Sequence, residues 1–293
     1  MLTKPYVGDL VAVTELSSEY ETASETLRRK LELLPSKFQW MRTTRPDGNC
    51  FYRGFAFGLC EWLMTLAEPE DVTRVVSVFE ASKADLLAAG FDEFIDDFWA
   101  MTMAPLRAIK GGNYSHDDLL ACFRDQERTE YIVQFMRFLV SLHLAKNADF
   151  FQFFIEGSGL SVDEFRRIEV EAVGRDADHV QITALTAYLD LAVRVVYLDQ
   201  STTADGAASE IVIPDGGRPV CTGPRSNRGA DACAHCNGHP RSLQWLFWLP
   251  TSRSGMRTDR GCTGWTSDMC WRFVQGLEHL INSEFLYMYP LAH

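Results

Sequence analysis

The sequence reads Arg45-Pro46-Asp47-Gly48-Asn49-Cys50-Phe51-Tyr52-Arg53 where an expected turn passes into an expected helix. Asp47, Gly48 and Asn49 are turn formers, whereas the apolar residues that follow Cys50 are compatible with a helix. The free N–H groups of a helix start would surround the Cys50 sulfur and favour its thiolate. A cysteine in this position is a candidate nucleophile, and the same N–H groups could receive an oxyanion.

The length and composition of the chain indicate a folded protein. With 293 residues, 46% of them hydrophobic, the chain can bury one large core or two smaller ones. Its apolar window at 132–144 is interrupted by Gln134, Arg137 and His143, so we expect no membrane span. The first residues lack the basic and then apolar pattern of a signal peptide. We therefore expect a soluble protein in the cytoplasm, with the nucleus as a second location.

Charge and cysteine content exclude several classes of function. The formal net charge of -12 argues against a nucleic-acid partner, which requires clustered lysine and arginine, and favours a basic partner. Eight cysteines in a chain without a secretion signal indicate free thiols, metal ligands or a nucleophile rather than a disulfide framework.

Apolar residues spaced three and four apart predict helices over most of the first half of the chain. The helices are expected at 14–34, from Cys50 onward, at 70–89 with Gly90 as its C-terminal cap, at 91–103, at 116–123, after a cap at Thr129, and at 180–189. Residues rich in β-branched and aromatic side chains predict strands at 38–41, 193–198 and 211–213. This order indicates an α+β fold in which a helical part packs on a small mixed β-sheet.

The composition changes abruptly between residues 216 and 283, where there are eight arginines, no lysine, five cysteines and four tryptophans. We therefore expect one domain at 1–215, which 284–293 could continue, and an anomalous insertion at 216–283. Two interpretations of the insertion stay open: an inserted subdomain, or sequence foreign to the fold such as a retained intron. Its Cys233-x-x-Cys236 pair, with His239 three residues on, is about half a zinc site, so we expect no bound metal.

Residues 44–53 resemble the nucleophile motif of the otubains, the ovarian-tumour (OTU) class of cysteine deubiquitinases, whose catalytic arrangement is papain-like. Four further segments are similar to otubain segments in the expected order. They are Asp85-Leu86-Leu87-Ala88-Ala89-Gly90-Phe91, Tyr131-Ile132-Val133-Gln134-Phe135-Met136-Arg137, Asn147-Ala148-Asp149-Phe150-Phe151 and Asp178-His179-Val180-Gln181-Ile182-Thr183-Ala184-Leu185. The resemblance extends from about residue 14 to about residue 214 and implies a papain-like otubain fold that needs no cofactor.

The resemblance also implies an activity and a set of site residues. Such an enzyme hydrolyses isopeptide and thioester bonds at the C-terminus of ubiquitin by a Cys-His mechanism. Cys50 would be the nucleophile, and the residue matching Asp47 is grouped with the catalytic residues. Gly48 and Asn49 would shape the oxyanion pocket and position the substrate. His293 is the candidate base, because the strand-like residues before it resemble those that precede the histidine of the family.

The resemblance leaves one alternative open. The family carries a residue that orients the histidine, and a closing strand, neither of which follows His293 in this sequence. The alternative is therefore a catalytically impaired otubain homologue that binds ubiquitin. The implied partners are ubiquitin, polyubiquitin chains and ubiquitin-conjugating enzymes. We expect His179, beside Asp178 at a helix start, to be a structural histidine.

Overall fold

The computed structural model describes residues 4–20, 23–92, 94–198, 203 and 205–213, and the backbone of 242–244, 246–247 and 285–290. The Cys233-x-x-Cys236 pair and His293 lie outside these residues. Within the described ranges, no helix combines the length and the apolarity needed to cross a bilayer.

Helices make up most of the described chain, as the apolar spacing predicted. The α-helices are α1 (Glu15–Glu19), α2 (Glu25–Leu33), α3 (Cys50–Thr65), α4 (Pro69–Ala88), α5 (Ile95–Lys110), α6 (His116–Arg124), α7 (Gln126–Lys146), α8 (Ala148–Ile155), α9 (Val162–Phe165) and α10 (His179–Leu189). Two 3-10 turns, η1 (Leu34–Ser36) and η2 (Glu156–Ser158), and a π-helical turn, η3 (Arg166–Val170), accompany them.

The helix expected at 91–103 is found at 95–110, as α5, and two other helix boundaries also differ from the prediction. The single helix expected at 14–34 is divided into α1 and α2, because Ser24 has an extended backbone and its hydroxyl accepts the N–H of Leu27 to begin a new helix. The cap of α7 is Asp125, which accepts the N–H of Arg128, and not Thr129. Thr129 lies fully buried inside α7, where its hydroxyl accepts a hydrogen bond from the Nε of Arg53.

The strands form a four-stranded and a three-stranded sheet. They are β1 (Val11–Ala12), β2 (Phe38–Thr43), β3 (Ala192–Tyr197), β4 (Ser209–Ile213), β5 (Ser242–Gln244), β6 (Leu246–Phe247) and β7 (Phe285–Pro290). The sheet orders are β1-β2-β7-β6, with every pair antiparallel, and β4-β3-β5, in which β3 and β5 are parallel. The expected α+β class, with helices packed on a small mixed sheet, is confirmed.

Two of these strands come from the segment interpreted as an insertion. The backbone of β5 pairs with β3, and the backbone of β6 pairs with β7, so residues 242–244 and 246–247 join the edges of the two sheets. The division of the chain into a domain and an insertion remains a prediction. β7 also pairs with β2. There, Pro290 lies opposite Phe38, and Leu286 lies opposite Thr43, at the end of β2 that leads to the Cys50 motif.

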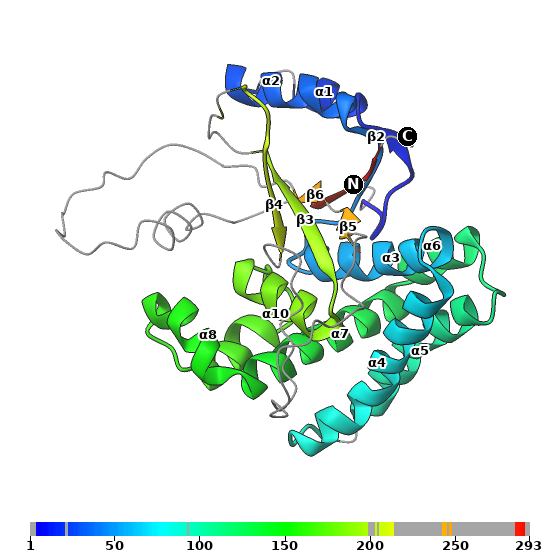
Figure 1. Cartoon of the computed structure of the whole chain (residues 1–293), viewed down its shortest axis with the longest axis vertical. Helices are drawn as coiled ribbons and strands as arrows, with labels where there is room; N and C mark the ends of the chain where they lie inside the picture. The colour runs from blue at the N-terminus through cyan, green and yellow to red at the C-terminus, as the bar shows by residue number, and fades with distance from the viewer. Residues whose placement is uncertain are drawn as a thin grey trace, which may run out of the picture.

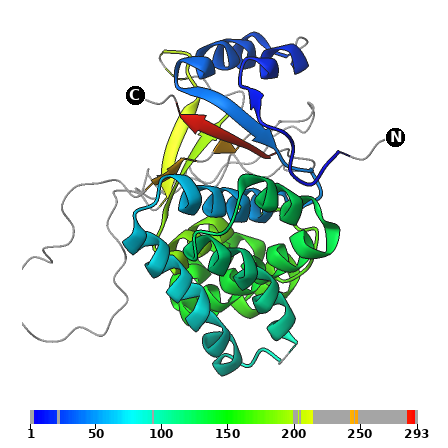
Figure 2. The ribbon, with the colours of Figure 1, turned by 90° about the vertical axis from the view of Figure 1, so that its right-hand side faces the viewer.

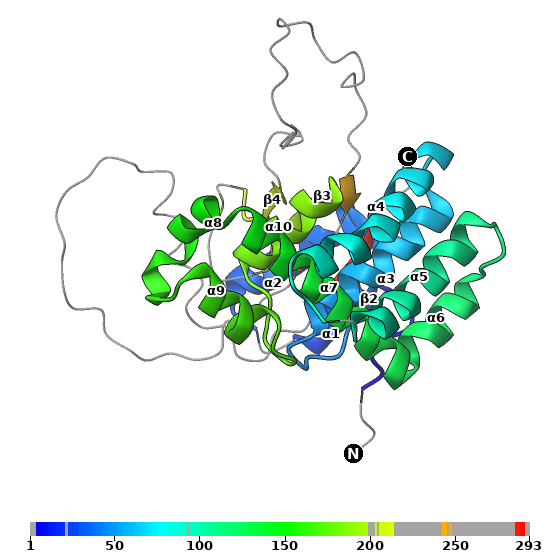
Figure 3. The same ribbon diagram turned by 90° about the horizontal axis from the view of Figure 1, so that it is seen from below.

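The strands lie between two helical layers of unequal size (Figures 1 and 2). Alternate residues of β3 face opposite sides: Val193 and Val195 belong to the large core, whereas Val196 belongs to a smaller core with Leu27 and Leu31 of α2. Figure 3 shows α8 and α9 at one end of the large helical layer and α4, α5 and α6 at the other, with α7 between them.

The helix that carries Cys50 is the central element of the large core. Most residues of α3 are buried, and the helix packs against α5, α6, α7 and β7. A helix that is apolar on nearly every side is stable only when it is surrounded by other elements. The start of α3, and with it Cys50, is therefore held in place by the whole helical layer.

Candidate active site

Cys50 is the first residue of α3, where the turn that was expected from the sequence passes into the helix. The preceding residue, Asn49, occupies the N-cap position but makes no side-chain capping bond to the helix. The Cys50 side chain is 0% exposed. The first turn of α3 thus places the thiol at the helix N-terminus and inside the protein.

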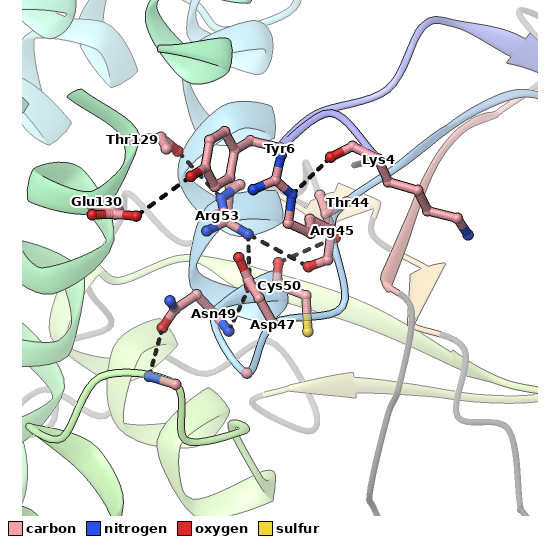
Figure 4. Close-up of polar contacts among 12 residues, drawn as sticks. Lys4, Tyr6, Thr44, Arg45, Asp47, Asn49, Cys50, Arg53, Thr129 and Glu130 are labelled. Carbon is pink, nitrogen blue, oxygen red and sulfur yellow. Dashed lines mark hydrogen bonds and ion pairs between the residues drawn. The ribbon is translucent and has the colours of Figure 1, made fainter. Parts of the chain in front are cut away.

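The side chain of Asp47 ties the motif to α3 from one side. Its Oδ1 accepts the backbone N–H of Asn49 at 3.0 Å and a hydrogen bond from the Nη1 of Arg53 at 2.9 Å. Figure 4 shows these contacts, with the Cys50 sulfur pointing away from Arg53. The N–H of Asn49, which was expected to help receive an oxyanion, is engaged by Asp47 in this arrangement.

The turn depends on Gly48 for a tertiary reason. Gly48 has a φ of 74°, in the region that favours glycine, and an added Cβ would lie 2.1 Å from the carbonyl oxygen of Gly174. Gly174 in turn donates its N–H to the Oδ1 of Asn49 at 3.2 Å. The loop around Gly174, between η3 and α10, therefore packs directly against the nucleophile motif and leaves no space for a side chain there.

Arg137 of α7 joins this loop to the motif. Its guanidinium, 0% exposed, donates to the carbonyl of Gly48 at 2.8 Å and to the Oδ1 of Asn49 at 2.6 Å. It also donates to the carbonyls of Val170 and Arg175 at 3.0 and 2.7 Å. A buried charge requires such partners, and here they are four oxygens of the two segments that form the site.

Asp176, in the loop between η3 and α10, places a carboxylate beside the Cys50 thiol. The Cys50 sulfur lies 3.9 Å from the Oδ1 of Asp176. Burial raises the pKa of the Cys50 thiol well above its ordinary value, and the negative charges of Asp176 and Asp47 raise it further. A hydrogen bond from the Phe51 backbone and the charge of Arg53 lower this pKa but do not prevail. The backbone N–H of Phe51 at the helix start does favour the thiolate, but burial and the two carboxylates outweigh it and keep the pKa of the thiol raised.

Asp176→Asn is expected to lower the pKa of the Cys50 thiol, because it removes a negative charge beside the sulfur. At pH 8, alkylation of Cys50 by iodoacetamide should become about threefold faster or more, and its pH profile should move to lower pH. Peptide mass spectrometry measures the rate at Cys50 separately from the other cysteines. Asp97→Asn, which removes an exposed carboxylate from α5, serves as the control. An unchanged pH profile in Asp176→Asn would contradict the expectation.

The histidines occupy different environments. His116 of α6 contacts the buried carboxylate of Glu61, and burial lowers the pKa of His143 to about 4. Burial also lowers the pKa of His179, which begins α10. His293, the candidate base, lies outside the described residues. Among the residues that the structure describes, no group of three or more His, Cys, Asp or Glu side chains could hold a metal ion.

Three residues at the site were missed from the sequence: Arg53, Arg137 and Asp176. A signal for Arg137 exists, because a charge on the apolar face of a helix must find buried partners. Arg53 gives the same signal, since it follows the apolar residues at the start of α3. Asp176 gives none, because it is 126 residues from Cys50 and no spacing connects the two.

The chain is similar in sequence to known proteins. The model of the otubain family, peptidase C65, matches residues 1–219. The OVARIAN TUMOR DOMAIN-containing deubiquitinating enzyme 1 of Arabidopsis thaliana is 38% identical over 210 residues, which are 70% of this chain and 69% of that protein. The Homo sapiens ubiquitin thioesterase OTUB1 is 36% identical over 216 residues, 73% of this chain and 78% of that protein.

The fold agrees as well. A solved structure described as "The structure of a ceOTUB1 ubiquitin aldehyde UBC13~Ub complex" superposes with a TM-score of 0.70 at 23% identity, covering 85% of this chain and 91% of that chain. At this identity the superposition shows a shared fold. The match to the family model and the sequence identity to two ubiquitin-specific enzymes show the family. The chain therefore belongs to the otubains, the peptidase C65 family of cysteine-type deubiquitinating enzymes.

Proposed function

We propose that this chain hydrolyses isopeptide and thioester bonds at the C-terminus of ubiquitin, with Cys50 as the nucleophile. The observation that carries the proposal is the position of Cys50 at the start of α3, in a turn that Asp47, Arg53 and Arg137 hold by hydrogen bonds. The named relatives are ubiquitin thioesterases or deubiquitinating enzymes, which supports ubiquitin as the substrate.

In the proposed reaction, the Cys50 sulfur attacks the carbonyl carbon of the C-terminal glycine of ubiquitin. The thiol proton passes to a base, and the resulting tetrahedral intermediate collapses as the lysine amine takes this proton and leaves. Water, deprotonated by the same base, then attacks the thioester and releases the ubiquitin carboxylate and the Cys50 thiol. The role proposed for Asp47 is support of the turn. Gly48 and Asn49, which are held by Arg137 and the Gly174 loop, are proposed to position the substrate by shaping the backbone beside the sulfur.

We assign the base to a histidine of the chain after residue 213, with His293 as the sequence-based candidate. The short strand that precedes it in the resemblance corresponds to β7, which pairs with β2, the strand that leads to the motif. Its closest competitor in sequence is His279. Replacing His293 by alanine should lower the rate of hydrolysis and leave ubiquitin binding unchanged. His279→Ala should change neither hydrolysis nor binding.

Ubiquitin and ubiquitin-conjugating enzymes are the proposed partners. Two further solved structures of the same fold are described as complexes of h/ceOTUB1 with ubiquitin aldehyde and either UBC13~Ub or UBCH5B~Ub. The net charge of -12 suits the arginine-rich C-terminal tail of ubiquitin. The proposed reaction needs no cofactor, because the thiol and a base supply all of its chemistry.

The aromatic residues of α8 form a surface suited to docking a protein substrate. Phe150, Phe153 and Phe154 are 56%, 80% and 48% exposed, and the rings of Phe150 and Phe154 lie 5.1 Å apart. Exposed aromatic residues grouped on one short helix mark an interaction surface more often than an accident of composition. The helix packs against α10, which follows the loop carrying Asp176, and against α7, whose Arg137 bonds to that loop.

Phe153→Glu is expected to raise the KM for a fluorogenic amide of ubiquitin about tenfold and to leave kcat within twofold, because it removes apolar area that the substrate would bury. The measurement is steady-state hydrolysis. Leu66→Glu is the matched control, since Leu66 is 73% exposed at the end of α3 and the change adds the same charge. Equal KM values for Phe153→Glu and Leu66→Glu would contradict the proposal that α8 docks the substrate.

The proposed function is tested with ubiquitin that carries a thiol-reactive electrophile at its C-terminus. We expect one adduct per chain, and peptide mass spectrometry should place it at Cys50 and not at Cys60 or Cys122, which are also buried free thiols. Hydrolysis of di-ubiquitin by the same preparation should accompany it. Absence of the adduct, or an adduct at another cysteine, would overturn the assignment of Cys50.

A second candidate function is ubiquitin binding without turnover. The observation in its favour is the state of Cys50, which is 0% exposed and whose thiol pKa is raised by burial and by two carboxylates. Binding of di-ubiquitin without hydrolysis would support this candidate. Steady hydrolysis of di-ubiquitin by the purified chain would exclude it.

A further inference from the structure

The N-terminal segment Lys4–Gly8 runs along the nucleophile motif. The N–H of Gly8 donates to the carbonyl of Thr43 at 2.8 Å, and Val7 forms an antiparallel bridge with Thr44. Further along, the N–H of Arg45 donates to the carbonyl of Tyr6 at 3.1 Å, and its side-chain Nε donates to the carbonyl of Lys4 at 2.7 Å. The segment thus continues the pairing of β2 into the motif itself.

The side chain of Tyr6 lies against two arginines of the motif (Figure 4). The guanidinium carbon of Arg45 is 3.6 Å from the centre of the Tyr6 ring, and that of Arg53 is 4.9 Å from it. Tyr6 itself is buried, and its hydroxyl lies 3.5 Å from a carboxylate oxygen of Glu130. The ring therefore supplies an electron-rich face to both cations in a place that water scarcely reaches.

Arg53 is a buried cation whose hydrogen bonds leave one terminal nitrogen of its guanidinium without a partner among the described residues. Its side chain is 0% exposed, and its Nη2 has no hydrogen-bond partner among the residues that the structure describes. The other terminal nitrogen of the same guanidinium, Nη1, donates to Asp47, which also accepts the N–H of Asn49. A chain of contacts therefore runs from the Tyr6 ring through Arg53 and Asp47 to the backbone beside Cys50.

We propose that Tyr6 is a positioning residue for Cys50, acting through the stack of its ring on Arg53 and Arg45. The ring holds the Arg53 guanidinium in the plane from which Nη1 reaches Asp47, and Asp47 then keeps the turn closed. Without the ring, only the hydrogen bonds to Thr129, to the Arg45 carbonyl and to Asp47 fix the guanidinium, so Asp47 is oriented less firmly. This role rests on the proposed function, in which Cys50 is the nucleophile.

The test compares Tyr6→Leu, Tyr6→Phe and Val7→Ala by the rate at which each forms the adduct with electrophilic ubiquitin. Tyr6→Leu should lower the maximal rate of adduct formation about tenfold and leave the concentration for half-maximal rate within twofold. Tyr6→Phe retains the ring and should stay within twofold of the parent chain in both. Val7→Ala, which loses core packing in the same segment, should lower the melting temperature but not the maximal rate.

Amide hydrogen exchange gives a readout that needs no activity. The Asn49 N–H, held by Asp47, should exchange about tenfold faster in Tyr6→Leu than in the parent, Tyr6→Phe or Val7→Ala chains. A parent chain that forms no adduct would refute the proposed function, and exchange at Asn49 would still decide the role of Tyr6. Unchanged exchange in Tyr6→Leu, or an equal effect in Tyr6→Phe, would overturn the proposal.

Discussion

A chain carrying Cys50→Ala is expected to form no adduct with electrophilic ubiquitin and to hydrolyse di-ubiquitin at least roughly 1,000-fold more slowly than the parent chain. The reason is that the turn and the start of α3 present one sulfur to the substrate, and alanine has no atom that can form the thioester. The effect should fall on the chemical step, since the Asn49 N–H still donates to Asp47 and Arg137 still donates to the turn.

The control for this variant uses two other buried thiols. Cys60 and Cys122 are also free, and burial raises the pKa of each, so neither is expected to react. Cys60→Ala and Cys122→Ala should each form the adduct at the parent rate. Because removing one buried sulfur creates a small cavity, all three variants should lose about 1 kcal/mol of stability. Undiminished labelling of Cys50→Ala would reject Cys50 as the nucleophile.

Arg137→Met is expected to lower the free energy of unfolding by about 4 kcal/mol. The guanidinium donates four hydrogen bonds to Gly48, Asn49, Val170 and Arg175, and each bond from a charged donor is worth about 1.5 to 3 kcal/mol. The contributions do not simply add, and methionine recovers the cost of burying a charge, so the net loss is smaller than their sum. Urea denaturation followed by circular dichroism measures the change.

Two matched variants make the Arg137 result specific. Arg137→Lys keeps the charge but cannot reach four oxygens at once, so its loss should be intermediate. Arg166→Met removes an arginine that also contacts two carboxylates, Asp163 and Glu171, but whose side chain is 16% exposed, and it should cost about 1 kcal/mol or less. A loss in Arg137→Met no greater than that in Arg166→Met would show that Arg137 does not hold the motif.

The effect of Arg137→Met should extend to Cys50. Without the guanidinium, the loop that carries Asp176 keeps only the hydrogen bond from the Gly174 N–H to Asn49, and the two segments separate more easily. We therefore expect faster alkylation of Cys50 by iodoacetamide in Arg137→Met, even under conditions where the chain remains folded. The rate at Cys60, which is buried ten residues further along α3, should stay at the parent value and report that the core is intact.

Elements whose residues repeat at a regular spacing were predictable from the sequence. The helices α4, α6 and α10 and the strands β2, β3 and β4 lie within a few residues of the ranges expected from the apolar pattern. Gly90, expected as a cap, has a φ of 88° after α4. The division between α1 and α2 and the cap of α7 were missed, because each depends on which of several polar residues reaches a free N–H.

Part of the candidate site was likewise predictable from the sequence, and part was not. Local chemistry was enough to find Cys50, Asp47, Gly48 and Asn49, because a turn followed by a helix is encoded in adjacent residues. What Gly48 does was predictable only in part: the sequence suggests close approach by a substrate, whereas in the structure the close neighbour is Gly174.

The sequence by itself determined the otubain family, the α+β class and the place of the nucleophile at the start of a helix, because these depend on short-range order along the chain. Tertiary structure alone decided the environment of that nucleophile. Asp176 and Arg137 come from segments far away in the sequence, and only packing brings their charges to the turn. The pKa of the Cys50 thiol depends first on burial and then on the charge of Asp176, neither of which the local motif contains.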